Sequence, residues 1–198
     1  MSRKVVAIVG SYRKGGMIDQ AVEAILEGAR ARGAATQTVQ LRNCHIEFCT
    51  NCRNCMQEPG VTRGKCVQQD DLEEILSGIE SADSVVLGSP VNAFNVTALF
   101  RRFLERLVGY GYWPWGQEVP KERTKFKPRK AVLVASAAMP GFLIPCATGA
   151  PRALRTAATL LGAKPVGKLW IGLAAREEHQ KLSNQTRLRA RHLGARLA

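Results

Sequence analysis

Short apolar runs typical of buried strands alternate along this sequence with longer stretches in which apolar residues recur at helical spacing. Residues 4–9 form a near-continuous apolar run that ends at Gly10, as expected for a strand buried on both faces. Further strands are predicted at 36–41, 84–88, 131–135 and 166–171. The segments between these strands carry apolar residues at helical spacing and are predicted to be helices, and a basic helix is predicted at the end of the chain. Without repeats or linkers, the alternation predicts an α/β fold, a doubly wound five-stranded parallel sheet with helices on both faces.

The bulk composition agrees with such a fold. A chain of 198 residues fits one domain, predicted here to span residues 1–198, and can bury a core. Its 45% hydrophobic and 23% charged content is typical of a globular protein in water. The longest early apolar stretch, 5–9, is too short for a membrane span or the apolar part of a signal peptide. The sequence therefore predicts a cytoplasmic protein with no membrane partner.

Positive charge dominates, with a formal net charge of +13. Residues 121–130 contain six Lys or Arg against one Glu, and 176–196 is a second basic stretch. Binding of nucleic acid through phosphates, steering of anionic cofactors and a solvated basic surface are all open interpretations. The chain has neither a Cys/Cys/His/His finger nor an RNA-type aromatic pair, so the sequence disfavours a nucleic-acid partner.

Four cysteines form the most distinctive motif. Cys49, Cys52 and Cys55 follow a Cys-x2-Cys-x2-Cys pattern, and Cys66 comes after a turn-rich gap. Such spacing is typical of iron–sulfur ligands, but a zinc site, a thiol/disulfide pair and bare thiols remain open. The run follows the second predicted strand. Since ligands bind at the carboxyl ends of strands, we expect the cysteines to lie beside a cofactor site.

Three polar loops follow predicted strands. Residues 10–16 join the first strand to the first helix, where glycines, helix N–H groups and Ser11, Arg13 and Lys14 can approach a phosphate. Residues 88–97 follow the third strand and can hydrogen-bond a flat heterocycle, with Phe94 stacked on it or packed into the core. Residues 136–141 follow the fourth strand. Because these loops meet at one sheet edge, they predict a site for a flat ligand.

Taken together, Gly10 to Lys14, Cys49 to Cys66 with Gly64, Asp70-Asp71, and Gly88 to Thr97 resemble the NADPH-dependent FMN reductase family, in particular its iron–sulfur flavoprotein branch. The resemblance covers most of 3–110 and continues more loosely to about 172. It implies a flavodoxin-like fold and bound FMN.

Site residues follow from that resemblance. The implied FMN contacts are Ser11, Arg13, Lys14, Gly16, Met17 and Ile18 around the phosphate, Pro90, Val91, Asn92, Ala93, Phe94, Asn95 and Val96 beside the isoalloxazine, and Ser136 and Gly141 on its other side. The family usually continues its first loop with Gly-Asn-Thr or Ser-Asn-Thr. Here Met17 and Ile18 replace two side-chain donors, which predicts weaker FMN binding.

The implied function is that of an FMN-dependent oxidoreductase. NADPH or NADH would reduce FMN, which would pass electrons to a quinone, nitro or azo compound, metal ion or free flavin, with no catalytic side chain required. One alternative is an iron–sulfur flavoprotein in electron transfer, with a 4Fe–4S cluster on Cys49, Cys52, Cys55 and Cys66. Another is a basic binding protein without redox activity. The family also implies a homodimer or homotetramer, and the aromatic stretch 109–120 suits either a flavin lid or an oligomer contact.

Overall fold

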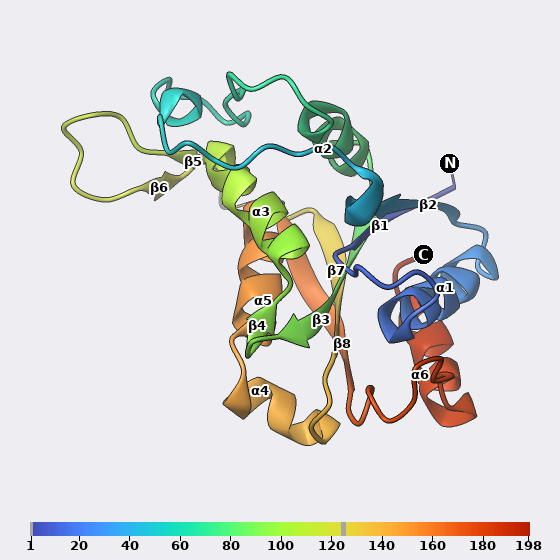
Figure 1. Ribbon diagram of the computed structural model, residues 1–198. Coiled ribbons are helices and arrows are strands. Elements are labelled where there is room, and N and C mark those ends of the chain that lie inside the picture. Colours follow the sequence, from blue (N-terminus) through green and yellow to red (C-terminus); the bar gives the residue numbers. More distant parts are fainter. Residues whose placement is uncertain (1, 124–125) are drawn as a thin grey trace.

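The predicted strands and helices recur in the computed structural model of the chain, which describes residues 2–123 and 126–198 (Figure 1). Met1 and residues 124–125 of the basic stretch lie outside the described residues. The strands are β1 (Lys4–Val9), β2 (Ala35–Gln40), β3 (Ser84–Asn92), β4 (Asn95–Val96), β5 (Gly111–Tyr112), β6 (Lys121–Glu122), β7 (Arg129–Ser136) and β8 (Ala163–Ile171). The α-helices are α1 (Met17–Arg30), α2 (Leu72–Glu80), α3 (Ala98–Arg106), α4 (Ile144–Ala147), α5 (Ala150–Leu160) and α6 (Asn184–Ala195). Short 3-10 turns are η1 (Leu41–Asn43), η2 (Asn54–Met56), η3 (Leu107–Tyr110) and η4 (Gly141–Leu143).

The main sheet confirms the predicted fold class. Its parallel strands lie in the order β2-β1-β3-β7-β8, and β4 adds an antiparallel partner to the end of β3. Within the described residues this is the five-stranded parallel sheet expected from the sequence, with the flavodoxin-like strand order. In that order the chain reverses direction across the sheet between β1 and β3, and the crevice outside their carboxyl ends is where such folds bind ligands.

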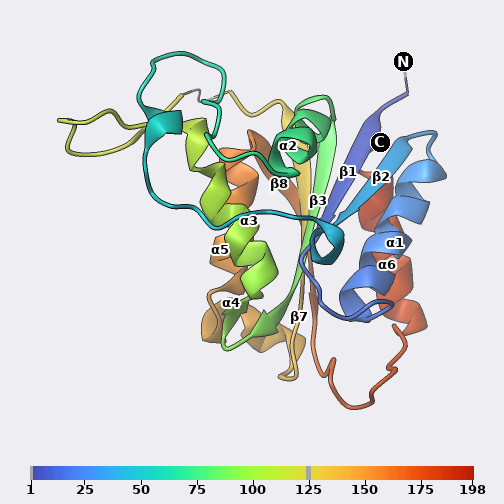
Figure 2. The same cartoon turned by 45° about the horizontal axis from the view of Figure 1, so that its top comes forward.

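Helices cover both faces of the sheet, as predicted (Figures 1 and 2). Along β1, Val5, Ala7 and Val9 pack into a core with α1 and α6, while Val6 and Ile8 pack into a second core with α2, α3 and α5. Because successive side chains of β1 point to opposite faces and both faces are buried in apolar cores, nearly every residue of the strand is apolar. Over the residues that can be described, no helix is long and apolar enough to span a membrane.

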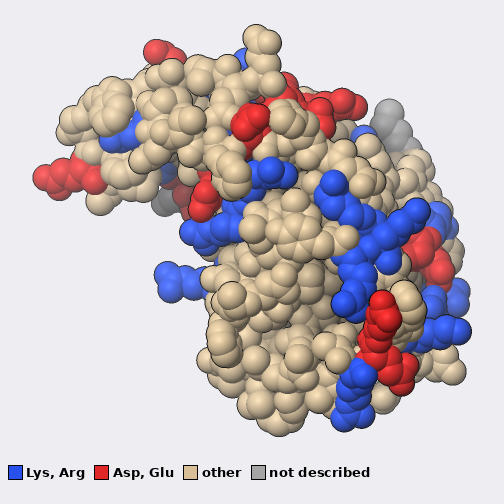
Figure 3. All heavy atoms as spheres, in the orientation of Figure 1, with Lys and Arg blue, Asp and Glu red and all other residues tan. Residues whose placement is uncertain are grey.

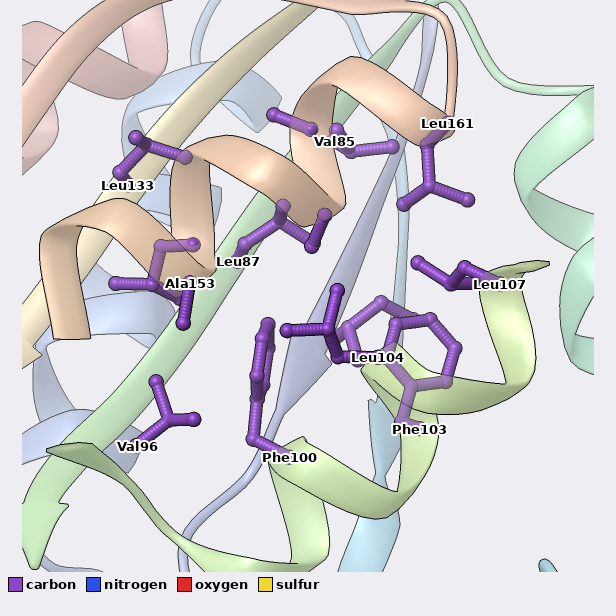
Figure 4. Close-up of a cluster of buried hydrophobic side chains, with 14 of the residues drawn as sticks. Val85, Leu87, Val96, Phe100, Phe103, Leu104, Leu107, Leu133, Ala153 and Leu161 are labelled. Carbon is purple, nitrogen blue, oxygen red and sulfur yellow. The ribbon is translucent and has the colours of Figure 1, made fainter. Parts of the chain in front are cut away.

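The second core is centred on α3. Phe100 and Phe103 are fully buried, and their rings meet edge to face at 6.0 Å (Figure 4). Phe100 also touches the sheet at Gly10, where an added Cβ would lie 2.6 Å from the Phe100 Cβ. Gly10 is therefore needed for close packing of α3 against the end of β1. This contact fixes the start of the phosphate-type loop relative to the core.

Two boundaries differ from the prediction. β3 continues to Asn92 rather than ending at Gly88, because β7 pairs with it as far as Pro90 and β4 pairs with its last residues. β2 ends at Gln40, and Leu41 opens the 3-10 turn η1. The sequence run 88–97 therefore begins as strand, not as loop.

The spacing of Asp71 and Glu74 predicts a capping pair at the start of α2, but the structure does not form one. Asp71 makes no side-chain cap for α2; its carboxylate accepts from the backbone N–H of His45 at 2.7 Å. The Leu72 N–H is instead bound by Asp70 at 3.0 Å. A long-range contact thus takes the place of the local one.

We expect Gly194→Ala to lower the free energy of unfolding by about 1–3 kcal/mol, because overpacking of a tight contact is costly. A Cβ at Gly194 would lie 1.8 Å from the Ile25 carbonyl oxygen, so α6 would have to move away from α1. The control is Gly78→Ala in α2, where no atom lies within 4 Å and helix propensity should add about 0.5–1 kcal/mol. Urea titrations of both variants test this. Equal stabilities would contradict the packing argument.

Candidate functional site

The three predicted loops meet around one cavity at the carboxyl edge of the sheet. Its volume is about 350 Å³. The lining residues are Ser11, Tyr12, Arg13, Lys14, Gly15, Gly16, Met17, Ile18, Pro90, Val91, Asn92, Ser136, Ala137, Ala138, Ala174, Ala175, Glu178, His179 and Gln180. The structure thus brings together most of the predicted cofactor contacts, at the expected switch point of the sheet.

Backbone donors dominate the loop between β1 and α1. Ser11 is buried, and its hydroxyl accepts the N–H of Arg13 at 3.3 Å. Gly15 has a φ of +70°, a conformation that favours glycine, and Gly16 is the N-cap of α1. The N–H groups of Met17 and Ile18 lie in the first helical turn, so the helix supplies no carbonyl for them. The loop therefore offers free donors at the positive end of a helix.

Lys and Arg side chains gather on the surface over η1 and this loop, with some acidic side chains among them (Figure 3). Arg13 and Lys14 belong to the cavity lining. The Ile18 side chain is buried and contacts Gly88, where an added Cβ would lie 2.9 Å from Ile18 Cγ2. The Ile18 side chain thus packs against the sheet.

Asp19 places a carboxylate in the first turn of α1, where an anionic ligand would be repelled. Its Oδ2 accepts the Gly15 N–H at 2.8 Å. Arg42, just after β2, donates to Asp19 Oδ1 and Oδ2 at 3.2 and 2.9 Å and to the Ser11 carbonyl at 3.2 Å. This bidentate pair neutralises the carboxylate and fixes the loop. Sequence reasoning missed both residues, although Arg42 follows a predicted strand at the expected edge.

The segment after β3 is a hairpin rather than an open loop. Ala93 and Phe94 both have positive φ, 45° and 61°, and Val96 pairs back onto Val91. Phe94 is 69% exposed, so it is not a core residue. Ala93, Phe94, Asn95 and Val96 do not line the cavity. Of this predicted set, Pro90, Val91 and Asn92 face the site.

A segment that sequence reasoning missed completes the cavity. Residues 174–180 follow β8, and backbone bonds from Leu173 to Met139 and from Ala174 to Ala137 join them to the loop after β7. Arg13 Nη1 donates to the Glu178 carbonyl at 3.0 Å. Gly141 lies outside the cavity lining, held so close to β8 that a Cβ would meet the Trp170 oxygen at 2.8 Å. The segment 174–180 follows the fifth predicted strand, and this position at the carboxyl edge of the sheet was the signal that could have identified it.

The four motif cysteines line a second, much smaller cavity of about 20 Å³. Cys66 reaches the others because Gly64 packs against Cys55; a Cβ on Gly64 would lie 1.9 Å from the Cys55 carbonyl oxygen. Burial raises the pKa of the Cys55 thiol, and the neighbouring Cys66, Cys49 and Cys52 raise it further. All six cysteines are free, and the described chain holds no group of three or more His, Cys, Asp or Glu arranged for a metal ion.

Two arginines share this cavity with the cysteines. Arg53 has a φ of 61°, and its guanidinium stacks on Trp113 at 3.9 Å and Trp115 at 4.2 Å. Arg106 pairs with Asp70 at 2.5 Å, and both side chains are 1% exposed. Within the described part of the chain, the Nε atoms of both arginines are buried and have no hydrogen-bond partner.

The cysteines do not lie beside the first cavity, so that expectation was wrong. The described linings of the two cavities share no residue. Thr97, the N-cap of α3, donates to the Gly10 carbonyl at 2.6 Å, whereas Arg106 at the other end of α3 lines the cysteine cavity. The nine residues of α3 separate the two ends by about 13 Å.

Hydrogen bonds from Arg106 explain this placement. Arg106 Nη1 donates to the Glu47 carbonyl, Gln68 Oε1 and Asp70 Oδ2, which holds both ends of the cysteine segment on the end of α3. The aromatic hairpin β5–β6 lies at the same end, away from the first cavity (Figures 1 and 2). Trp113 and Trp115 therefore do not form a lid over that cavity within the chain.

Acid should weaken the Arg106–Asp70 contact. Burial alone raises the pKa of Asp70, but hydrogen bonds from Arg106 and from the N–H groups of Glu47 and Leu72 outweigh it and leave the pKa lowered. Because the folded-state pKa is the lower one, this stabilisation is complete above about pH 4 and is lost as the pH falls through the folded-state pKa.

We therefore expect the unfolding free energy of the wild type to fall more steeply below about pH 4 than that of Asp70→Asn, which has no proton to gain at this position. Urea titrations at a series of pH values measure both curves. Other carboxylates contribute equally to the two proteins and cancel in the difference. Parallel curves would contradict the assignment.

Comparison with known proteins gives a consistent family match. The sequence pattern described as NADPH-dependent FMN reductase matches residues 3–175. An iron-sulfur flavoprotein of Archaeoglobus fulgidus is 36% identical over 111 residues, which cover 56% of this chain and 48% of the relative. An iron-sulfur flavoprotein of Methanosarcina thermophila is 32% identical over 105 residues, 53% of this chain and 52% of the relative. The chain thus spans about half the length of the curated relatives it matches.

Solved structures resemble the fold over its whole length. An NAD(P)H:quinone oxidoreductase from Methanothermobacter marburgensis superimposes with a TM-score of 0.71 at 21% identity and covers 100% of both chains. An azoreductase from Bacillus anthracis str. Sterne gives a TM-score of 0.70 at 13% identity, over 98% of this chain and 99% of that one. At such low identity these similarities concern the fold alone.

Proposed function

Because the chain belongs to the NADPH-dependent FMN reductase family, we propose that it is an FMN-dependent oxidoreductase that takes electrons from NADPH or NADH. A quinone, nitro or azo compound, metal ion or free flavin would receive them. The observation that carries this proposal is the cavity formed by the loops after β1, β3, β7 and β8. When bound, FMN supplies hydride acceptance and electron transfer, and the chain supplies binding and orientation.

The residues present fit FMN. Ser11, Arg13 and Lys14, with the backbone N–H groups of Met17 and Ile18, offer donors and charge for a phosphate. Arg42 cancels the charge of the Asp19 carboxylate. The cavity volume of about 350 Å³ lies within the range of about 300–1,000 Å³ for small-molecule sites. Residues 90–92 and 136–138 line the cavity side by side, because Pro90 pairs with Ser136 in the sheet, and both segments would contact a flat ring.

A second candidate function is electron transfer by an iron–sulfur flavoprotein. Four thiols converge on one cavity together with two buried arginine donors that have no partner among the described residues, which suits an anionic 4Fe–4S cluster. Each thiolate would bind a different iron, so the four sulfur atoms would have to lie farther apart than they would around a single metal ion. A cavity of about 20 Å³ must widen on loading, and Cys52 is exposed on its surface loop.

Assembly and location belong to the same proposal. Residues 1–198 would form one FMN-binding domain that assembles as a homodimer or homotetramer. Six free thiols agree with a reducing compartment, the cytoplasm. The competing hypothesis is a basic binding protein without redox activity, and detection of bound FMN would contradict it.

The test is the absorption spectrum of anaerobically purified protein, with FMN, iron and sulfide analysis. Flavin bands that bleach on addition of NADPH or NADH are expected for the first function. An additional broad absorption with matching iron and sulfide is expected for the second. Protein that binds no FMN after reconstitution contradicts the oxidoreductase, and iron-free protein that binds FMN removes only the cluster.

A further inference from the structure

Arg106 is a buried cation between an ion pair and the cysteine cavity. Its side chain is 1% exposed, and Asp70, equally buried, holds the guanidinium through Nη1 at 2.5 Å and Nη2 at 3.4 Å. The Gln68 side chain and the Glu47 carbonyl accept further bonds from Nη1. These contacts fix the guanidinium in one orientation.

Part of that guanidinium faces the thiols. Arg106 lines the cysteine cavity together with Cys66. Its Nε is fully buried and lacks a partner within the described residues. An unpaired buried donor destabilises the folded state, so its persistence beside four thiols suggests that an acceptor occupies this position in the loaded protein.

We propose that Arg106 donates a hydrogen bond to cluster sulfur at Cys66 and thereby raises the reduction potential of the cluster; the inference rests on the second proposed function. Hydrogen bonds to the sulfurs disperse the negative charge that increases on reduction, so they favour the reduced form. Asp70 is the positioning residue that holds Arg106. Only one electron is transferred, from a reductant such as dithionite, and no bond is made or broken.

The chain offers a matched comparison in Arg102, one turn earlier on α3. Its Nε is also buried without a partner in the part of the chain described. Arg102, however, stacks near Phe48 at 5.6 Å and does not line the cysteine cavity. The two arginines thus share the helix, the charge and a buried Nε, although Arg102 as a whole is less buried, and only Arg106 lines the cysteine cavity.

The experiment measures the midpoint potential of the reconstituted cluster by anaerobic titration followed by EPR. Arg106→Lys keeps the charge opposite Asp70 and removes the guanidinium donors. We expect its equilibrium constant for one-electron reduction to fall about tenfold, which is a shift of about 59 mV to lower potential. Arg102→Lys should match the wild type.

Equal potentials in Arg106→Lys and the wild type would overturn the inference, and so would an equal shift in Arg102→Lys. Wild-type protein that takes up no iron would instead remove the second proposed function, on which the inference depends. The two failures are therefore distinguishable by iron analysis.

A second measurement covers the case in which Arg106→Lys does not assemble the cluster. Protein labelled with nitrogen-15 at arginine Nε is reduced with dithionite and studied by pulsed EPR. A coupling between the cluster spin and arginine nitrogen is expected, and it should persist in Arg53→Lys, which removes the other arginine of the cavity. No coupling in Arg53→Lys would overturn the inference.

Discussion

Replacing Asp70 by alanine is expected to lower the free energy of unfolding by about 3–5 kcal/mol, the usual cost of breaking a buried ion pair. The variant would leave the Arg106 guanidinium uncompensated at 1% exposure and would also free the Glu47 and Leu72 N–H groups. Because both ends of the cysteine segment depend on this contact, that segment should loosen first. Urea titration of the metal-free protein measures the loss without a contribution from ligand binding.

The control is Glu23→Ala, which breaks an ion pair with Arg30 on the surface of α1. There the side chains are 54% and 44% exposed, so water screens the attraction, and we expect a change of at most about 1 kcal/mol. Similar losses in the two variants would mean that the Asp70 contact is no more important than a surface pair.

Arg13→Gln is expected to raise the dissociation constant of FMN about 10- to 150-fold, since a hydrogen bond to a charged group contributes about 1.5–3 kcal/mol. Arg13 lines the cavity beside the free N–H groups of α1 and also holds the Glu178 carbonyl. Fluorescence titration of the apoprotein with FMN measures the constant.

Riboflavin separates loss of a phosphate contact from collapse of the site. It carries the same ring system without the phosphate, so its affinity should be nearly unchanged in Arg13→Gln. Arg32→Gln, an exposed position beyond the end of α1, should leave both affinities as they are. Parallel losses for FMN and riboflavin would indicate that Arg13 acts through the 174–180 segment rather than on the phosphate.

The strands were predictable because local pattern decides them, whereas their order followed from the resemblance to a family with a flavodoxin-like fold. β1 is apolar on both faces from Val5 to Val9, so its sequence alone predicts that it is buried between helices. The loops after β1, β3 and β7 were equally predictable, since parallel strands must end at one edge. The hairpin at Ala93 and Phe94 was not, because left-handed residues other than glycine give no sequence signal.

Positions that depend on distant contacts could not be predicted. Cysteine spacing indicates that four thiols meet, but their location on the end of α3 depends on hydrogen bonds from Arg106 to residues 36 to 59 positions earlier. Arg42 and Asp19, 23 positions apart, meet across two elements. The sequence contains 29 Lys and Arg residues, and nothing in it distinguishes the buried Arg106 from the exposed ones.

The helix α3 begins against the backbone of Gly10 and ends with Arg106 among the cysteines. Its amphipathic face is anchored in the core by Phe100 and Phe103 between those ends. Since a short helix of this kind opens and closes as one cooperative unit, a ligand that stabilises one end also suppresses local unfolding at the other. The helix α3 is thus the physical connection between the two cavities, even though they have no lining residue in common within the described chain.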